Sequence, residues 1–377
     1  WSSDVCSSDL LTAVKHNLFN TGIDADFNFG GSSWSRDMHS LSAHSGTWYY
    51  PNWYSLSNYT STIYGQDANG NTIIIKQGDQ LSSLVPVNSY YKKKINSLYT
   101  FLHLSYKDYL FLELTGRNDW SSTLPSNANS YFYPGMSVSY VVSDALNIKN
   151  KWLSYCKVRG GAAQTATDTE PYQTEFYYAT TLFGGDQSSN YPGVIPPLAL
   201  KPQRVNTYEL GTNLGFFDDR IVLDFTYYYK YSFDQIIKTP LPASAGASSV
   251  VINEGALSDR GFEILLNATV VKGQQLTVKS GLNFTRNRNK VVSLGNYADT
   301  YILADIWGEN GPQMALHEGD DFGTIVGWDY VYKNGQPVVN ATGTKYLISD
   351  KRVPIGNASP HFLAGWTTEW NYKNFKI

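Results

Sequence analysis

The sequence predicts an all-β protein, and more specifically part of a transmembrane antiparallel β-barrel. Apolar and polar residues alternate with a period of two along much of the chain. The alternating run at 220–233 is more than twice as long as the usual soluble strand of about 5–6 residues, and it satisfies the roughly 9–11 residues that a tilted membrane strand needs. Tight turns and long connections also alternate, as in barrels with long loops on one side and short turns on the other.

The composition agrees with a β-rich membrane protein and excludes other classes. Of the 377 residues, 16% are charged and 15% are aromatic, whereas about 25% are charged in a typical soluble domain. The net charge of −3 gives no electrostatic support for nucleic acid as a partner. No apolar run approaches the roughly 18 residues of a membrane-spanning helix, which excludes a helical membrane protein.

Residues 1–10 (WSSDVCSSDL) look foreign to the rest of the chain. They read as the in-frame translation of a sequencing-adapter oligonucleotide, and we expect them to be an artefact; a genuine polar tail is the alternative. Cys6 is then discounted, which leaves Cys156 without a partner for a disulfide. We expect residues 11–377 to form a single partial barrel.

The alternation assigns two different faces to each strand. At 220–233, Ile221, Leu223 and Phe225 face away from Asp224 and Thr226. A soluble sandwich buries such an apolar face between two sheets, whereas a barrel turns it toward lipid and lines a wet lumen with the polar face. We expect strands in the segments 108–119, 205–216, 220–233, 259–270 and 275–287, with weaker patterns at 15–29, 95–106, 131–142, 153–163 and 361–372.

The connections favour the barrel. Short turns are expected at 106–109, 217–219, 272–274 and 372–374, and long links at 120–130, 164–204, 234–258 and 290–321. A sandwich or propeller would show mostly short and similar turns. In two other loops, at 60–76 and 328–339, Asn69-Gly70 and Asn334-Gly335 predict hairpins with type I′ turns.

Several stretches resemble a known family of barrels. The segment 92–145 is similar to the barrel of SusC/RagA-type TonB-linked outer-membrane proteins, which belong to the TonB-dependent receptors, and it carries the motif RNDWSS at 117–122. Trp120 stands where that family often has Gly, and Phe262 stands where Val is usual. Further similar stretches, in the family's order, are 157–164, 207–234, 253–263, 321–326 and 356–372.

This resemblance implies an importer in the outer membrane of a Gram-negative, Bacteroidota-like bacterium. Such proteins take up nutrients, here oligosaccharides or peptides, and glycan import is one form of this. Their partners are the lipid of the outer membrane, TonB, which acts through a plug domain that we do not find in this sequence, and a SusD-like surface lipoprotein. The family barrel has about 22 strands, so the chain would form about half of it.

The expected binding residues follow from the same resemblance, and no catalytic, metal or cofactor-binding residue is expected. No nucleophile-elbow, zinc-protease or nucleotide-binding motif occurs, so the chain is not expected to be an enzyme. A soluble secreted β-sandwich that binds glycans is the alternative, and it would bury the apolar strand faces. Aromatic rings in exposed loops could stack on sugars and charged lumen residues could contact substrate, although ordinary packing is the alternative for each; the candidates are Trp48, Trp53, Tyr54, Trp120, Tyr177, Tyr178, Glu113 and Arg117.

Overall fold

The computed structural model has strands as its main secondary structure and divides into two compact units. The smaller unit contains Trp1–Ser7 and Ser32–Ile95, and the larger contains Ser8–Gly31 and Asn96–Ile377. The structure describes residues 2–42, 47–48, 59–60, 63–66, 72–76, 87–148, 150–176, 178–183, 186–191, 193–197, 199–296, 299–305, 308 and 311–377.

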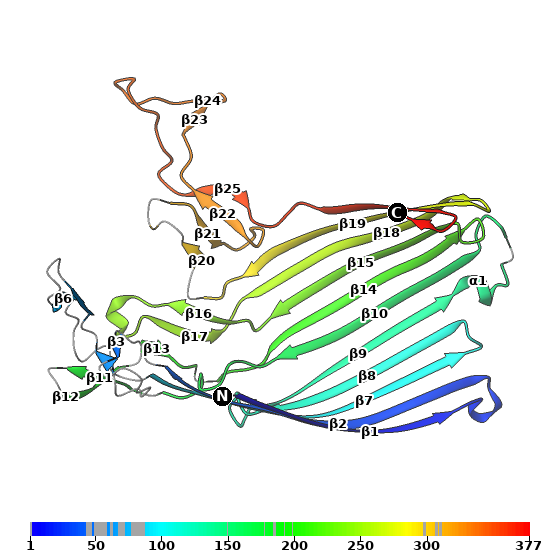
Figure 1. The fold of residues 1–377 in the computed structure, drawn as a ribbon, viewed down its shortest axis with the longest axis horizontal. Helices are drawn as coiled ribbons and strands as arrows, with labels where there is room; N and C mark the ends of the chain where they lie inside the picture. Colours follow the sequence, from blue (N-terminus) through cyan, green and yellow to red (C-terminus); the bar gives the residue numbers. More distant parts are fainter. Residues whose placement is uncertain are drawn as a thin grey trace. The chain divides into compact units, whose positions relative to one another are not determined.

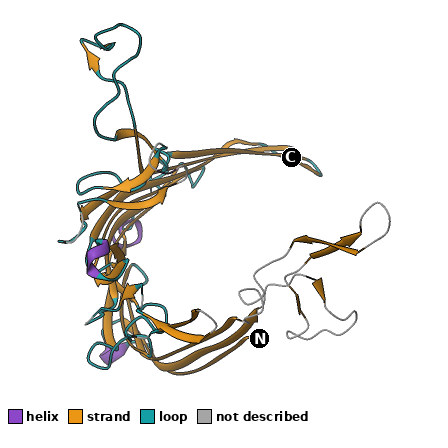
Figure 2. Ribbon diagram, turned by 90° about the vertical axis from the view of Figure 1, so that its left-hand side faces the viewer, coloured by secondary structure: helices purple, strands orange, loops and turns teal. Residues whose placement is uncertain are grey.

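One sheet of twelve strands dominates the fold. The strands from β8 onward lie wholly in the larger unit, where they form a single curved layer (Figures 1 and 2). Every neighbouring pair from β8 to β27 is antiparallel. In sheet order the strands are β1 (Ser2–Lys15), β2 (Ile23–Ser42), β7 (Val87–Tyr106), β8 (Leu110–Ser121), β9 (Ser130–Val141), β10 (Tyr155–Thr167), β14 (Gln203–Phe216), β15 (Ile221–Phe233), β18 (Ala256–Lys272), β19 (Leu276–Ser293), β26 (Leu363–Tyr372) and β27 (Phe375–Lys376).

The expected strands are confirmed, with one exception near the N-terminus. The segment 15–29 is not one strand, because β1 ends at Lys15 and β2 begins at Ile23. Between them a 3-10 turn, η1 (Leu18–Asn20), reverses the chain. Asn17, Asn20 and Gly22 adopt positive φ there, a conformation that asparagine and glycine tolerate better than most residues.

Most connections alternate in length, as expected; the exception is the link from β9 to β10, which is longer than the link from β8 to β9 although it lies among the tight turns. In the larger unit the tight turns gather at one end of the strands and the long connections at the other (Figure 1). Consecutive positive-φ residues form the turns at Lys107–Asp108 and Phe217–Asp219. A one-turn helix, α1 (Val142–Ala145), lies in the link from β9 to β10. We refer to the two ends of the strands as the turn end and the loop end.

The long connections contain short sheets of their own. At one hairpin tip Asn334 and Gly335 have φ of 51° and 76°, which confirms the type I′ turn. Asn69-Gly70 lies outside the described residues, although β5 and β6 on either side of it pair antiparallel. The short elements are β3 (Thr47–Trp48), β4 (Tyr59–Thr60), β5 (Ile63–Gln66), β6 (Thr72–Lys76), β11 (Ala179–Phe183), β12 (Asp186–Asn190), β13 (Val194–Ile195), β16 (Ile236–Pro240), η2 (Ala243–Ala245), β17 (Ser249–Asn253), β20 (Tyr301–Asp305), β21 (Gln313–Leu316), β22 (Thr324–Gly327), β23 (Tyr332–Lys333), β24 (Gln336–Pro337) and β25 (Val353–Asn357).

The apolar face of the large sheet is open, which overturns the sandwich alternative. Leu210 is 60% exposed, Tyr227 44% and Tyr229 36%. Ile221, Leu223 and Phe225 are partly exposed, and none of these side chains is buried as a sandwich core would require. Exposed apolar residues on one face and polar residues on the other are the arrangement of a membrane barrel. We call these the outer face and the lumen face.

The buried core is small and lies under the loops rather than under the sheet. One cluster joins Leu124, Tyr131, Leu200 and Val251, and a second joins Val291 with neighbours from the link after β19. Both clusters lie at the loop end, where they hold the long connections against the strand ends. Among the described residues no helix is long and apolar enough to cross a membrane.

Candidate functional site at the lumen face and loop end

The lumen face is a continuous polar surface because the registers of successive strands agree. Across successive strands, Glu113 pairs with Ser137, Ser137 pairs with Gly161, and Gly161 pairs with Glu209. Glu209 in turn faces Tyr228 across the next pair. The same face carries Thr115, Arg117, Arg159, Thr207, Asn213, Asp224, Thr226, Glu263, Asn283, Thr285 and Thr367.

At the centre of this face Arg159 forms a charged network that spans three strands. Its Nη2 lies 2.7 Å from Asp224 Oδ1 and donates to Thr226 Oγ1 at 2.6 Å. Asn213 accepts from Arg159 and donates to Asp224 Oδ2 at 2.5 Å. The guanidinium crosses Gly211, where a Cβ would lie 2.8 Å from Arg159 Nε. Glycine at 211 therefore keeps the path of this side chain open. Arg159 was not among the residues expected from the sequence. The only indication in the sequence was an arginine on the polar face of a strand rich in small residues.

Arg117 is held near the loop end of the lumen face. Its Nε bonds to Asp119 at 2.8 Å and its Nη2 donates to Ser97 at 2.9 Å. The hydroxyl of Tyr133 donates to the other oxygen of Asp119 at 2.7 Å. This network links β7, β8 and β9, so the first part of the RNDWSS motif ties strand ends together.

The rest of that motif anchors a loop. Ser121 and Thr123 both donate to the buried carboxylate of Asp168, which follows β10. Leu124 packs beside them in the core cluster with Tyr131. A buried carboxylate needs such donors, and the three residues join the link after β8 to the link after β10.

Glu113 lies nearer the turn end of the same face. Its carboxylate is 3.7 Å from His103 Nδ1, and both side chains are about half exposed. The two residues help to line a pocket of about 490 Å³, together with Asp24 and Asp26. Glu113 and Arg117, both expected in the lumen, thus lie on one face but have different partners.

The loop aromatics come together in one place. Phe176, Tyr178 and Tyr191 have ring centroids 5.2 to 6.5 Å apart, and Tyr178 is 60% exposed. The segments around them also line a pocket of about 520 Å³ whose polar residues include Glu175 and Lys238. Tyr178 was expected from the sequence, whereas Phe176 and Tyr191 were not. In a segment without alternation the sequence does not show which aromatic residues will lie together in space.

The other expected aromatics are placed differently. Trp120 is not in a loop, because it lies in β8 opposite Ser130 and follows the alternation of the outer face. Trp48 lies in β3 and pairs with Tyr59. Trp53, Tyr54 and Tyr177 lie outside the described residues.

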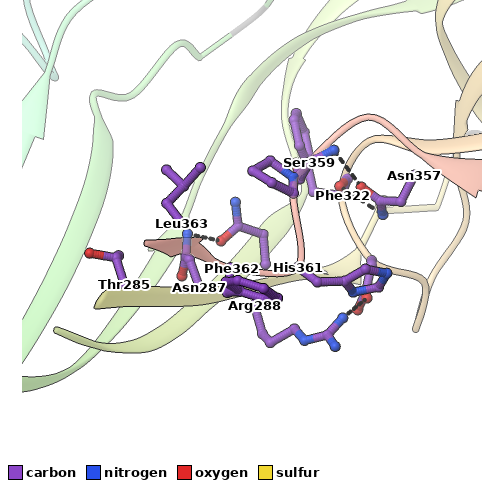
Figure 3. Close-up of a pocket in the computed structure, with 12 residues that line it drawn as sticks. Thr285, Asn287, Arg288, Phe322, Asn357, Ser359, His361, Phe362 and Leu363 are labelled. Atoms are coloured by element: carbon purple, nitrogen blue, oxygen red, sulfur yellow. Dashed lines mark hydrogen bonds and ion pairs between the residues drawn. The ribbon is translucent and has the colours of Figure 1, made fainter. Parts of the chain in front are cut away.

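A further pocket, of about 230 Å³, lies at the loop end of β19 (Figure 3). Arg288 bonds to Asp321 at 3.2 Å, while Asn357, Ser359 and His361 come from the segment that precedes β26. This pocket offers amide, hydroxyl and imidazole groups, which suit hydroxyl-bearing or peptide ligands. In the described part of the chain no group of three His, Cys, Asp or Glu side chains could hold a metal ion.

Comparison with known proteins identifies the family. The family model described as "TonB dependent receptor-like, beta-barrel" matches residues 7–376. The chain belongs to this family. Like SusC and RagA, this TonB-dependent receptor barrel is therefore a protein of the outer membrane.

Two relatives show how much of such a receptor the chain represents. It is 26% identical over 313 residues to TonB-dependent receptor P3 of Formosa agariphila, covering 74% of this chain and 31% of that protein. It is 24% identical over 299 residues to TonB-dependent receptor SusC of Bacteroides thetaiotaomicron, covering 71% of this chain and 28% of SusC. The TonB-dependent receptor barrel described here thus spans about a third of the length of these relatives.

Solved structures share the fold. The RagAB peptide transporter superposes with a TM-score of 0.76 at 16% identity, covering 100% of this chain and 40% of that chain. The outer-membrane transporter YddB of Escherichia coli gives 0.52 at 12% identity, covering 98% and 48%. The half-barrel architecture of this TonB-dependent receptor is therefore confirmed.

Proposed function

We propose that the protein imports oligosaccharides or peptides across the outer membrane, energised by TonB and assisted by a SusD-like lipoprotein. The observation that carries the proposal is the continuous polar lumen face with pockets at its loop end. Polar pockets beside a water-filled lumen can bind a solute that forms hydrogen bonds, and they bind an apolar solute less well. The structural likeness to a peptide transporter and the sequence likeness to SusC support the same function.

The proposed first contacts are in the loops. The exposed rings of Phe176, Tyr178 and Tyr191 offer flat apolar surfaces with polar edges, which suit sugar faces or peptide side chains. Glu175 and Lys238 beside them can bond to hydroxyl or peptide groups. Trp48, Trp53, Tyr54 and Tyr177 remain proposed aromatic contacts for the solute, and Glu113 and Arg117 remain proposed contacts in the lumen. Trp120 is not proposed as a contact, because it follows the alternation of the outer face.

The test compares loop tyrosines in the full-length receptor. Tyr178→Ala with Tyr191→Ala should weaken binding of the transported solute by about 30-fold, because two central aromatic contacts of about 1 kcal/mol each together contribute about 2 kcal/mol. Tyr332→Ala, at an exposed tyrosine of the β23–β24 hairpin, is the matched control and should change binding little. Titration calorimetry with defined oligosaccharide and peptide pools measures the affinity.

Uptake in cells separates binding from transport. Deleting TonB should abolish accumulation of radiolabelled solute while surface binding persists. Accumulation of neither pool above that of a receptor-deletion strain, or equal accumulation without TonB, contradicts the proposed import. If the control and the double variant lose the same affinity, the proposed role of the aromatic cluster is wrong, whereas the proposed import is not affected.

A further inference from the structure

Arginines gather on the outer face at the loop end of β18 and β19. Arg260 lies directly opposite Arg288, and Arg286 lies one step away, opposite Phe262. Lys290 follows two residues after Arg288 on the same strand face. Because side chains on one strand alternate between faces, these four cations share the outer face with Phe262 and are not part of the lumen.

The cluster is short of negative charge. Arg288 is paired with Asp321, whereas the exposed Arg260 and Arg286 have no hydrogen-bonding or ion-pair partner among the described residues. Asp259, which is next to Arg260 in sequence, belongs to the lumen face, opposite Lys230, and Asp321 is already held by Arg288. Like charges directly opposite each other destabilise a strand pair, so an anion between them would relieve the repulsion.

An apolar stripe borders the cluster on its turn-end side. The rings of Phe225, Phe262, Phe284 and Phe362 follow one another across four neighbouring segments, with centroids 6.4, 5.8 and 5.5 Å apart. They lie on the face that contacts the acyl chains of the membrane. The arginines therefore lie where this apolar stripe ends toward the loops, at the level of lipid headgroups.

We propose that Arg260 and Arg286, with Arg288 beside them, bind the phosphate of a lipid headgroup in the outer leaflet. Guanidinium groups bond bidentately to phosphate oxygens, and diagonal cross-strand neighbours are about 7–8 Å apart, a gap that one phosphate between two long side chains can bridge. The phenylalanine stripe contacts the acyl chains of the same lipid. Basic clusters beside a membrane face recognise anionic lipids in this way.

The experiment uses the full-length receptor in detergent, with diphosphorylated lipid A as the probe and native mass spectrometry as the readout. The combined variant Arg260→Gln and Arg286→Gln should lose roughly tenfold or more of the lipid affinity. The control removes two exposed cations at the turn end, Lys272→Gln and Lys373→Gln, and should bind as the wild type does. Retained affinity in the arginine variant, or equal loss in the control, overturns the proposal.

Three further arms identify the ligand and check folding. Enzymatically dephosphorylated lipid A should not be retained, and inorganic phosphate at the same concentration should not displace the lipid because it lacks acyl chains. Retention of the dephosphorylated lipid, or displacement by inorganic phosphate, overturns a lipid-phosphate site. Arg260→Lys with Arg286→Lys preserves charge and folding, and should bind between wild type and the glutamine variant because lysine cannot form the bidentate contact; full binding by this variant overturns the proposed geometry.

Discussion

The Arg159–Asp224 pair on the lumen face should stabilise the barrel measurably. Both side chains are about one-third exposed, at 34% each. Fully exposed pairs contribute about 0.2–1 kcal/mol, and hydrogen bonds to charged groups about 1.5–3 kcal/mol. Since this pair is partly screened by water but held by Asn213 and Thr226, we expect a coupling free energy of about 1–2 kcal/mol.

A double-mutant cycle measures that coupling. Arg159→Gln, Asp224→Asn and the double variant are compared in the full-length receptor by urea unfolding in lipid vesicles, followed by tryptophan fluorescence. Each single variant leaves one charge on the lumen face without its counterion. The losses of unfolding free energy in the two single variants should therefore add up to more than the loss in the double variant. The coupling should shrink at high salt, because the pair is reached by solvent.

Lys157→Gln is the matched control on the same strand and the same face. Lys157 has no ion-pair partner among the described residues, so its removal should change the free energy of unfolding by no more than about 0.5 kcal/mol. A coupling near zero at low salt, or an effect of Lys157→Gln as large as that of Asp224→Asn, would refute the reasoning.

Two other predictions test the faces and the packing of the sheet. On β9, Met136→Arg on the outer face should cost about 2–4 kcal/mol and reduce membrane assembly, whereas Ser137→Arg on the lumen face should be tolerated; equal assembly in outer-membrane fractions would contradict the assignment of faces. Gly261→Ala places a Cβ 2.5 Å from Tyr228 Oη and should destabilise by about 1–3 kcal/mol, while Gly356→Ala has open space and should have little effect. Thermal unfolding monitored by gel mobility measures both, and equal midpoints would count against the packing argument.

The strand faces and the turn positions could be predicted because they depend on local chemistry. Period-two alternation places Ile221 and Asp224 on opposite faces whatever the neighbouring strands are. Asn334-Gly335 marks its turn because these residues accept positive φ. The exception at 15–29 has a local cause too: Asn17, Asn20 and Gly22 could have marked a turn inside the alternation.

The candidate site was predictable only in part. Glu113 and Arg117 were placed on the lumen face by alternation, and Tyr178 was placed in a loop by composition. Their partners were not predictable, because His103 and Ser97 lie in the neighbouring strand β7. The register between β7 and β8 cannot be deduced from the sequence of either strand alone. Trp120 was expected in a loop because strand boundaries are the least certain feature of a pattern, and pairing with Ser130 extends β8 to include it.

The sequence by itself determined that this is an outer-membrane β-barrel of the TonB-dependent receptor type, since alternation, connection lengths and family motifs are properties of short segments. Only the tertiary structure decided which residues meet. Register brought Arg159 to Asp224 across 65 positions of chain, and it set Arg260 opposite Arg288 on the outer face. The physical reason is that strand pairing depends on hydrogen bonds between segments distant in sequence, whereas the direction of each side chain depends only on its own strand.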